Sequence, residues 1–146
     1  LQHNALKLLD DIIEAHGNEP AIISLFLCSN ALMQQVNYQH RQVNKPTNVL
    51  SFPSCEMPVN NRVPGVPMIL GDILIAAEIT ARDAEILKIG LPDHLIHLFV
   101  HGLLHLFGHD HVDAEMAETM ESLEIKYLAK IGVANPYQGM HLEFHQ

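Results

Sequence analysis

Three histidines at a short spacing are the residues of this chain best suited to chemistry. They are His101, His105 and His111, in the run HLFVHGLLHLFGHDH over residues 97–111. Two histidines four residues apart on a helix lie one turn apart on the same face, so both imidazoles can reach one ion. Gly108 can take the left-handed conformation that ends a helix and turns the chain, which would bring in His111 as a third ligand. The spacing therefore predicts a metal site.

Three nitrogen ligands favour a catalytic zinc site over a structural one. They leave tetrahedral Zn²⁺ one open position, whereas structural zinc is usually closed by a fourth protein ligand. We therefore predict zinc as the cofactor, held by His101, His105 and His111. His97 is an alternative third ligand, because it lies four residues before His101. Three histidines over two helical turns would, however, spread over roughly 10–12 Å at a rise of about 1.5 Å per residue, too far for one ion.

Composition indicates one globular domain with little general affinity for nucleic acid. The chain has 146 residues, of which 48% are hydrophobic and 17% charged, so residues 1–146 can bury a single core. The formal net charge of −9 disfavours non-specific binding to nucleic acid, which depends on lysine and arginine contacts with phosphates. We expect no DNA partner, and any RNA would have to meet a local basic patch or the metal.

Cysteine content and hydropathy indicate a cytoplasmic protein without a membrane partner. Cys28 and Cys55 are too few for a disulfide framework, which suggests a reducing compartment. No apolar run reaches the roughly 18–20 residues that span a membrane. Acidic residues near the N-terminus also do not match the pattern of a signal peptide.

Hydrophobic periodicity predicts the helices and strands that position these residues. Apolar spacing and capping signals predict helices over 2–16, 29–41 and 77–87, a metal-bearing helix from Pro92, and a last helix over 113–131. Runs rich in branched and aromatic residues predict strands over 21–28, 49–52 and 68–76. We expect the strand over 21–28 to be largely buried. The order strand, helix, strand up to residue 52 suggests a parallel crossover unit.

Glycine, proline and acidic residues mark the remaining features of the chain. Residues 53–67 contain four prolines and are expected to form an irregular surface loop. Gly71, inside a predicted strand, suggests a bulge or a close approach of the backbone to a ligand. Five acidic residues of the last helix are expected to form its solvated face: Asp113, Glu115, Glu118, Glu121 and Glu124.

With the run HGLLHLFGHDH in view, the chain resembles the YbeY family, bacterial metal-dependent endoribonucleases of ribosomal RNA maturation with the signature HGxLHLxGxDH. Asn37, Arg41, Thr47 and the run VLSFP over 49–53 look like that family's N-x-x-x-R and T-[DN]-V-L-S-F-P stretch. The run LGDI over 70–73 is similar to its third block. The resemblance thus rests on three separate blocks.

The resemblance covers about residues 36–132, and it implies an α+β fold with a small mixed β-sheet flanked by helices and a metzincin-like metal-bearing helix. It also implies zinc at the three histidines, cleavage of single-stranded RNA, maturation of the 3′ end of 16S rRNA, and a part in ribosome quality control. Ribosomal RNA and the small ribosomal subunit are the implied partners. The chain departs from the family at Asn48, where aspartate is common, and at His109, where tyrosine is frequent.

Two further residues are candidate catalytic groups. Arg41 matches the family's arginine, and its planar guanidinium suits a phosphate whose charge it could offset. Asp110 could orient a ligand imidazole, cap the turn at Gly108 or act as a general base, and we favour the first two roles. Ser51 could line the cleft, although a strand serine is more often structural, and Asp72 is equally ambiguous.

Three functions compete on these observations. The first is a zinc-dependent single-strand endoribonuclease, the second a zinc hydrolase of another class such as a peptidase, and the third a non-catalytic ribosome assembly factor with a structural metal. Metzincin peptidases share the histidine spacing but use a glutamate after the first histidine as base, where this chain has Gly102. Gly102 counts against the peptidase, because it supplies no base. An open metal position counts against the assembly factor with a structural metal. We therefore predict a single metal-dependent hydrolase domain that cleaves RNA.

Overall fold

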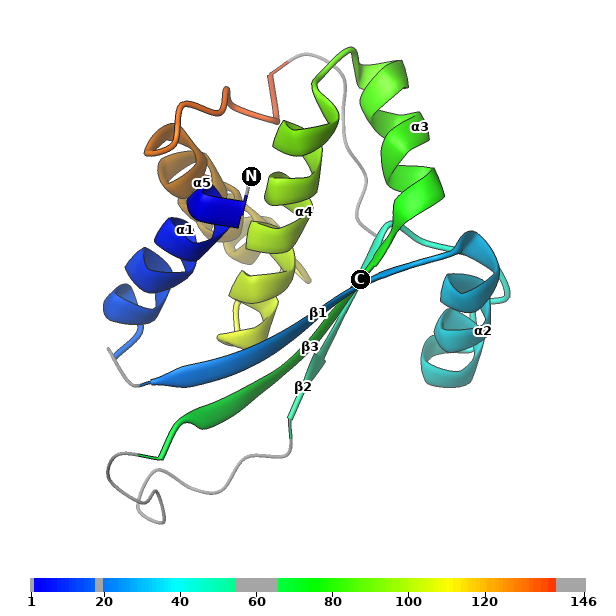
Figure 1. The fold of residues 1–146 in the computed structure, drawn as a ribbon, viewed down its shortest axis with the longest axis horizontal. Coiled ribbons are helices and arrows are strands. Elements are labelled where there is room, and N and C mark those ends of the chain that lie inside the picture. The colour runs from blue at the N-terminus through cyan, green and yellow to red at the C-terminus, as the bar shows by residue number, and fades with distance from the viewer. Residues whose placement is uncertain (1, 18–19, 55–65, 139–146) are drawn as a thin grey trace.

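The computed structural model describes residues 2–17, 20–54 and 66–138, which form five helices and a three-stranded sheet (Figure 1). The helices are α1 (Gln2–Ala15), α2 (Asn30–Arg41), α3 (Ala77–Leu87), α4 (Leu91–Leu106) and α5 (Ala114–Ala129). The strands are β1 (Ala21–Cys28), β2 (Val49–Pro53) and β3 (Met68–Ala76). The predicted α+β class with a small mixed sheet is confirmed.

Side chains cap α2 and α5 where the sequence predicts. Ser29 accepts a hydrogen bond from the backbone N–H of Leu32 (3.2 Å), and Asp113 accepts one from that of Met116 (2.8 Å). Each cap satisfies a backbone donor of the first helical turn that has no partner within the helix. Among the described helices, none combines the length and the apolar character needed to cross a lipid bilayer.

The sheet has the strand order β1-β3-β2, so β3 lies in the middle. β1 is parallel to β3, whereas β2 is antiparallel to it. The predicted parallel crossover from β1 to β2 is therefore wrong, because these two strands are not neighbours and run in opposite directions. The crossover joins β1 to β3 instead, and both α2 and β2 lie within this connection.

Helices cover both faces of the sheet. Val49 and Ile73 point to one face, where they pack in the larger core with α1, α4 and α5. Leu50 and Ala76 point to the other face and pack against Met33 of α2. Figure 1 shows α1, α4 and α5 grouped on one side of the strands and α2 on the other. Because α4 is buried along most of its length, it is a fixed platform for the side chains that it carries.

Gly71 lies at a bulge of the sheet, which the sequence predicts, and at a close approach of β2 to β3, which it does not. Its φ is +143°, and a Cβ there would lie 2.2 Å from the carbonyl oxygen of Phe52. The pairing of β1 with β3 shifts register between Ile22 and Ile23, opposite this position. The expected irregularity is confirmed, and only glycine fits there.

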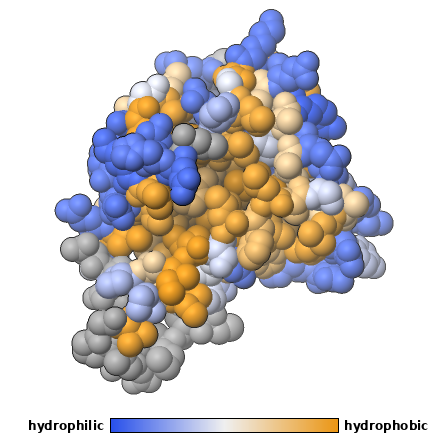
Figure 2. Space-filling model, viewed as in Figure 1, coloured by the Kyte–Doolittle hydropathy of each residue, from blue (hydrophilic) through white to orange (hydrophobic). Residues whose placement is uncertain are grey.

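β1 is an exposed edge strand, and the prediction that it is largely buried is wrong. Leu25, Phe26 and Leu27 are 47%, 53% and 61% exposed. Successive residues of a strand point to opposite faces, so both faces of β1 expose hydrophobic side chains. In Figure 2 the hydrophobic residues gather over the middle of this view, where the strands lie in Figure 1. An apolar run predicts a strand, but its burial depends on neighbours that the run does not specify.

The proline-rich segment 53–67 falls largely outside the described residues, which omit 55–65. At its edges Pro53 ends β2 and Met68 begins β3. The backbone N–H of Ser54 donates to the carbonyl oxygen of Leu70 (3.0 Å), so the strand pairing extends to that point. The irregular loop expected between these residues stays a prediction.

Candidate metal centre

The end of α4 and the turn that follows bring the three predicted ligands together. His101 and His105 lie one turn apart on α4, and Gly108, with φ +96°, turns the chain so that His111 approaches them. One nitrogen of each ring can be chosen so that all three atoms lie within 4.8 Å of one another. His101 is buried, whereas His105 and His111 are partly exposed. The cluster therefore has a buried wall and a side that solvent reaches.

The nitrogen atoms of this cluster suit a zinc ion. His101 Nε2 and His105 Nε2 are 3.1 Å apart, near the roughly 3.3 Å expected in a tetrahedral site with Zn–N bonds of about 2.0–2.1 Å. His111 Nε2 is buried and has no hydrogen-bond partner among the described residues. A buried ring nitrogen without a partner is costly, and a metal ion would satisfy it. The side chains present fit the metal, and its binding stays a prediction.

Burial keeps these imidazoles in the form that binds metals. Burial, together with the nearby His101 and His111, lowers the pKa of His105 to about 4. The pKa of His101 is also lowered by burial, although its hydrogen bond to Glu124 acts in the opposite direction. Both rings are therefore uncharged at neutral pH. A ligand imidazole has to be neutral, so no proton needs to be displaced there.

Asp110 shapes the turn that carries His111. Its Oδ1 accepts a hydrogen bond from the backbone N–H of His111 (2.8 Å). The backbone N–H of Gly108 donates to His105 O and that of His109 to Leu104 O, both at 3.0 Å, which closes the end of the helix. The favoured roles of Asp110, which are to orient a ligand imidazole or to cap the turn at Gly108, stay predictions. A catalytic role for Asp110 stays a prediction.

A pair of histidines joins α1 to the same turn. His16 Nδ1 lies 2.7 Å from Ile12 O, and His16 Nε2 lies 2.8 Å from His109 Nε2. Because His16 donates from Nδ1 to the carbonyl, its Nε2 accepts from the N–H of His109. His16 also stacks on Phe107, with ring centroids 4.6 Å apart. His109 thus anchors the turn to the end of α1 through His16.

Glu124 does not belong to the solvated face of the last helix, and that prediction is wrong. Its side chain is 0% exposed, and its Oε1 lies 2.7 Å from His101 Nδ1. Burial alone would raise the pKa of Glu124, but the hydrogen bond from His101 and the nearby His97 lower it to about 2, so the carboxylate is ionised. The sequence contained a signal, because Glu124 falls between Met120 and Tyr127 on the buried face of α5.

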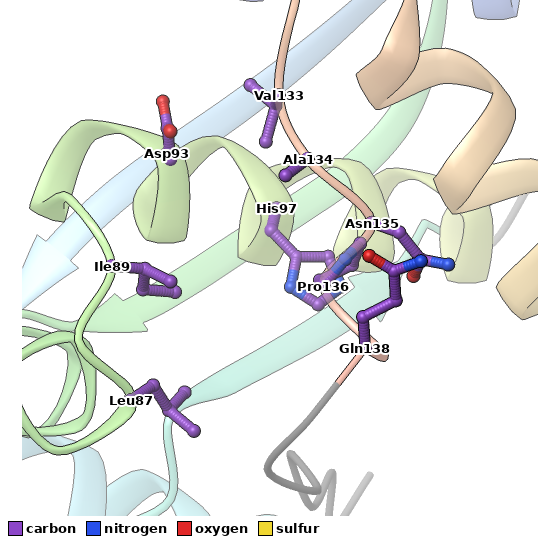
Figure 3. A pocket seen from close by; sticks show the side chains of 9 residues that line it. All are labelled: Leu87, Ile89, Asp93, His97, Val133, Ala134, Asn135, Pro136 and Gln138. Atoms are coloured by element: carbon purple, nitrogen blue, oxygen red, sulfur yellow. The ribbon is translucent and has the colours of Figure 1, made fainter.

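Tyr137 and His97 complete the surroundings of this carboxylate. The hydroxyl of Tyr137 donates to Oε2 of Glu124, and His97 Nε2 lies 3.5 Å from Oε1. Figure 3 shows His97 projecting from α4 toward the segment 133–138, where it lines a cavity of about 90 Å³. His97 therefore lies beside Glu124 and outside the group of possible metal ligands. This placement agrees with the choice of His111 over His97 as third ligand.

Arg41 lies in the last turn of α2, on the face of the sheet opposite to α4. Its Nη1 donates to Asn37 Oδ1 (3.4 Å), and Asn37 Nδ2 donates to Lys45 O (2.8 Å). Asn37 thereby holds the segment that leads into β2. The expected cleft shared by Arg41 and the metal ligands stays a prediction.

Gly102 lies where α4 packs closely on the sheet. A Cβ at this position would lie 2.9 Å from Ile73 Cγ2 and 3.0 Å from Ser51 Oγ. Ser51 Oγ itself donates to Gly102 O (2.9 Å), so this serine links β2 to α4. Asp72 is exposed and pairs with Phe52 on the opposite face of the sheet. Neither Ser51 nor Asp72 is among the possible metal ligands.

Comparison with known proteins gives the family of this chain. The family model described as Endoribonuclease YbeY matches residues 1–132. Proteins named Endoribonuclease YbeY include one from Rhizobium etli, 46% identical over 140 residues that cover 95% of this chain and 80% of that protein. The chain belongs to the YbeY family. Another YbeY protein, from Francisella philomiragia, is 42% identical over 126 residues that cover 86% of this chain and 79% of that protein.

Membership of the YbeY family confirms the resemblance and, with it, the expected class of enzyme, an endoribonuclease. A solution structure of a Thermotoga maritima protein matches the fold with a TM-score of 0.59 at 24% identity. That match covers 94% of this chain and 87% of the other. It supports the α+β fold alone.

Proposed function

We propose that this chain is a zinc-dependent, single-strand-specific endoribonuclease of the cytoplasm that acts in maturation of the 3′ end of 16S rRNA and in ribosome quality control. The observation that carries the proposal is the convergence of His101, His105 and His111 in a chain of the YbeY family. Ribosomal RNA would be the substrate and the small ribosomal subunit the partner.

The side chains of the cluster suit phosphodiester cleavage. A bound zinc ion supplies a Lewis acid for a phosphoryl oxygen and lowers the pKa of a bound water to about 7. His101, His105 and His111 would hold it through neutral ring nitrogens, and the partial exposure of two of these rings leaves a side for substrate. Arg41 is assigned to the phosphate, because a guanidinium can donate two parallel hydrogen bonds to its oxygens.

The two competing functions have less support. A peptidase of the metzincin type needs a base at position 102, where this chain has glycine and where a Cβ would force Ile73 or Ser51 to shift. A purely structural metal would favour a closed set of four protein ligands. Among the described residues the group of possible ligands has three members, two of them partly exposed.

The test is cleavage of RNA by zinc-loaded protein. We expect single-stranded rRNA fragments to be cut, fragments locked in stable duplex to remain intact, and His105→Ala to be inactive on both. Casein should remain intact under the same conditions. Equal RNA cleavage by wild type and His105→Ala would contradict the proposal, as would casein digestion that His105→Ala abolishes.

A further inference from the structure

We infer that Glu124, supported by Tyr137 and His97, is a positioning residue that fixes the ring of His101 and thereby sets the metal affinity of the three-histidine cluster. This inference rests on the proposed metal centre and goes beyond it, since it assigns a role to residues outside the ligand set. The observation that carries it is a fully buried carboxylate whose hydrogen bonds lead to the ring of a candidate ligand.

The contact determines which nitrogen of His101 carries the proton. His101 Nδ1 lies 2.7 Å from Glu124 Oε1, and because a carboxylate oxygen accepts hydrogen bonds, Nδ1 carries the proton. A neutral imidazole with its proton on Nδ1 presents a lone pair on Nε2. That second atom lies 3.1 Å from His105 Nε2, inside the cluster. Glu124 therefore holds His101 from behind, in the tautomer that a metal ligand requires.

Two side chains from different parts of the chain contact the carboxylate and hold it in place. Tyr137, in the segment after α5, donates its hydroxyl to Oε2. His97, one turn before His101 on α4, places Nε2 3.5 Å from Oε1. Since both oxygens are engaged, rotation of the carboxylate away from His101 would break contacts at both ends. The positions of α4, α5 and the segment that carries Tyr137 therefore determine the position of the ring of His101, one of the candidate metal ligands.

The alternative is that these contacts only attach α5 to α4 and do not affect the metal site. A structural role alone predicts that loss of Glu124 lowers thermal stability while folded protein keeps its zinc affinity and the His101 tautomer. A positioning role predicts that both change. Affinity and tautomer, measured on folded protein, are therefore the readouts that separate the two roles.

The experiment compares Glu124→Gln, which keeps an acceptor oxygen, with Glu124→Met, which keeps the length of the side chain without an acceptor. Zinc affinity is measured by competition with a chromophoric chelator, on samples whose folding is verified by circular dichroism. We expect roughly 10–100-fold weaker binding in Glu124→Met, in the range found when groups that orient metal-bound histidines are removed. Glu124→Gln should weaken zinc binding less than Glu124→Met does. Tyr137→Phe should also weaken zinc binding, because the carboxylate of Glu124 would be held less firmly.

Glu118→Gln is the matched control, because it removes the same charge from an exposed position of α5. It should leave zinc affinity unchanged. Long-range ¹H–¹⁵N NMR of metal-free protein should show His101 protonated at Nδ1 in wild type and a mixture of tautomers in Glu124→Met. Unchanged affinity and tautomer in a folded Glu124→Met would overturn the inference. If wild type kept the Nδ1 proton but bound no zinc, the metal centre would be wrong and the positioning of His101 would stand.

Discussion

His111 is the residue that distinguishes the two possible ligand sets. We predict that His111→Ala removes most of the zinc, as do His101→Ala and His105→Ala, because each removes one of three converging nitrogens. At saturating zinc His97→Ala should keep close to one equivalent, because it removes a contact of Glu124 but none of the three converging nitrogens. Elemental analysis of the purified variants measures this. A His97→Ala variant without zinc, beside a His111→Ala variant that retains it, would reverse the assignment.

Arg41 offers a second test at a single residue. Arg41→Ala should leave zinc content and thermal stability nearly unchanged, because the side chain is partly exposed and its hydrogen bond to Asn37 is long. RNA cleavage should fall at least ~10²-fold, on the order of 2.7 kcal/mol of barrier. Single-turnover cleavage with enzyme in excess provides the measurement.

Arg82→Ala is the control for this variant, because Arg82 is an exposed arginine on α3. It should cleave at the wild-type rate. Arg41→Lys should recover part of the lost activity, since an ammonium keeps the charge but not the planar fork of donors. Near wild-type cleavage by Arg41→Ala would remove Arg41 from the catalytic groups.

The sequence alone predicts the candidate metal ligands, but it does not predict the residues that hold them in position. His101, His105 and His111 lie within one helix and the turn after it, so their convergence follows from local geometry. Glu124 and Tyr137 reach His101 from other segments, and the acidic neighbours of Glu124 concealed its position on the buried face of α5. The partnership of His16 with His109 likewise depends on how α1 packs, which local patterns do not specify.

At the level of elements, the approach of α4 to the sheet depends on Gly102. We predict that Gly102→Ala lowers the free energy of unfolding by about 1–3 kcal/mol, the usual cost of overfilling a packed core. The added methyl would press on Ile73 and Ser51. Gly90→Ala is the matched control, because its nearest neighbour would be Pro92 Cδ at 3.8 Å. Urea denaturation measures both variants, and equal stabilities would contradict the packing argument.

Strands were easier to locate from the sequence than to pair. The runs that form β1, β2 and β3 are rich in branched and aromatic residues, which identifies them as strands. Their order depends on contacts between distant segments, such as Ala21 with Met68. No local pattern reveals that β2 pairs antiparallel beyond β3, or that β1 forms the exposed edge. The predicted crossover and the predicted burial of β1 therefore failed together, for the same physical reason.

For the molecule as a whole, buried histidines predict loss of stability in acid. His94 is 0% exposed, and burial, reinforced by His97, lowers its pKa to about 4. In the unfolded chain the pKa of histidine returns to about 6.5, so the unfolded state binds more protons between these two values. The free energy of unfolding of metal-free protein should therefore fall as pH drops from about 6.5 to about 4. His94 alone would contribute at most ~3 kcal/mol of this loss.

The measurement is urea denaturation of metal-free protein at several pH values. His94→Leu should flatten the dependence on pH without abolishing it, because His105 has a similarly lowered pKa and contributes with the same sign. Identical pH dependence in wild type and in a folded His94→Leu variant would show that His94 does not contribute.

The candidate ligands also have a property that matters when the protein is unfolded. All three lie between residues 101 and 111, so a denatured chain still carries them close together and can chelate zinc weakly. A ligand that binds the unfolded state stabilises the native state by less than its native affinity implies. We predict that saturating zinc raises the free energy of unfolding by less than RT ln(1 + [Zn]/Kd). A synthetic peptide of residues 91–112 should bind zinc tightly enough to account for the missing stabilisation. The unfolded chain would then act as a chelator that competes with the native site for zinc.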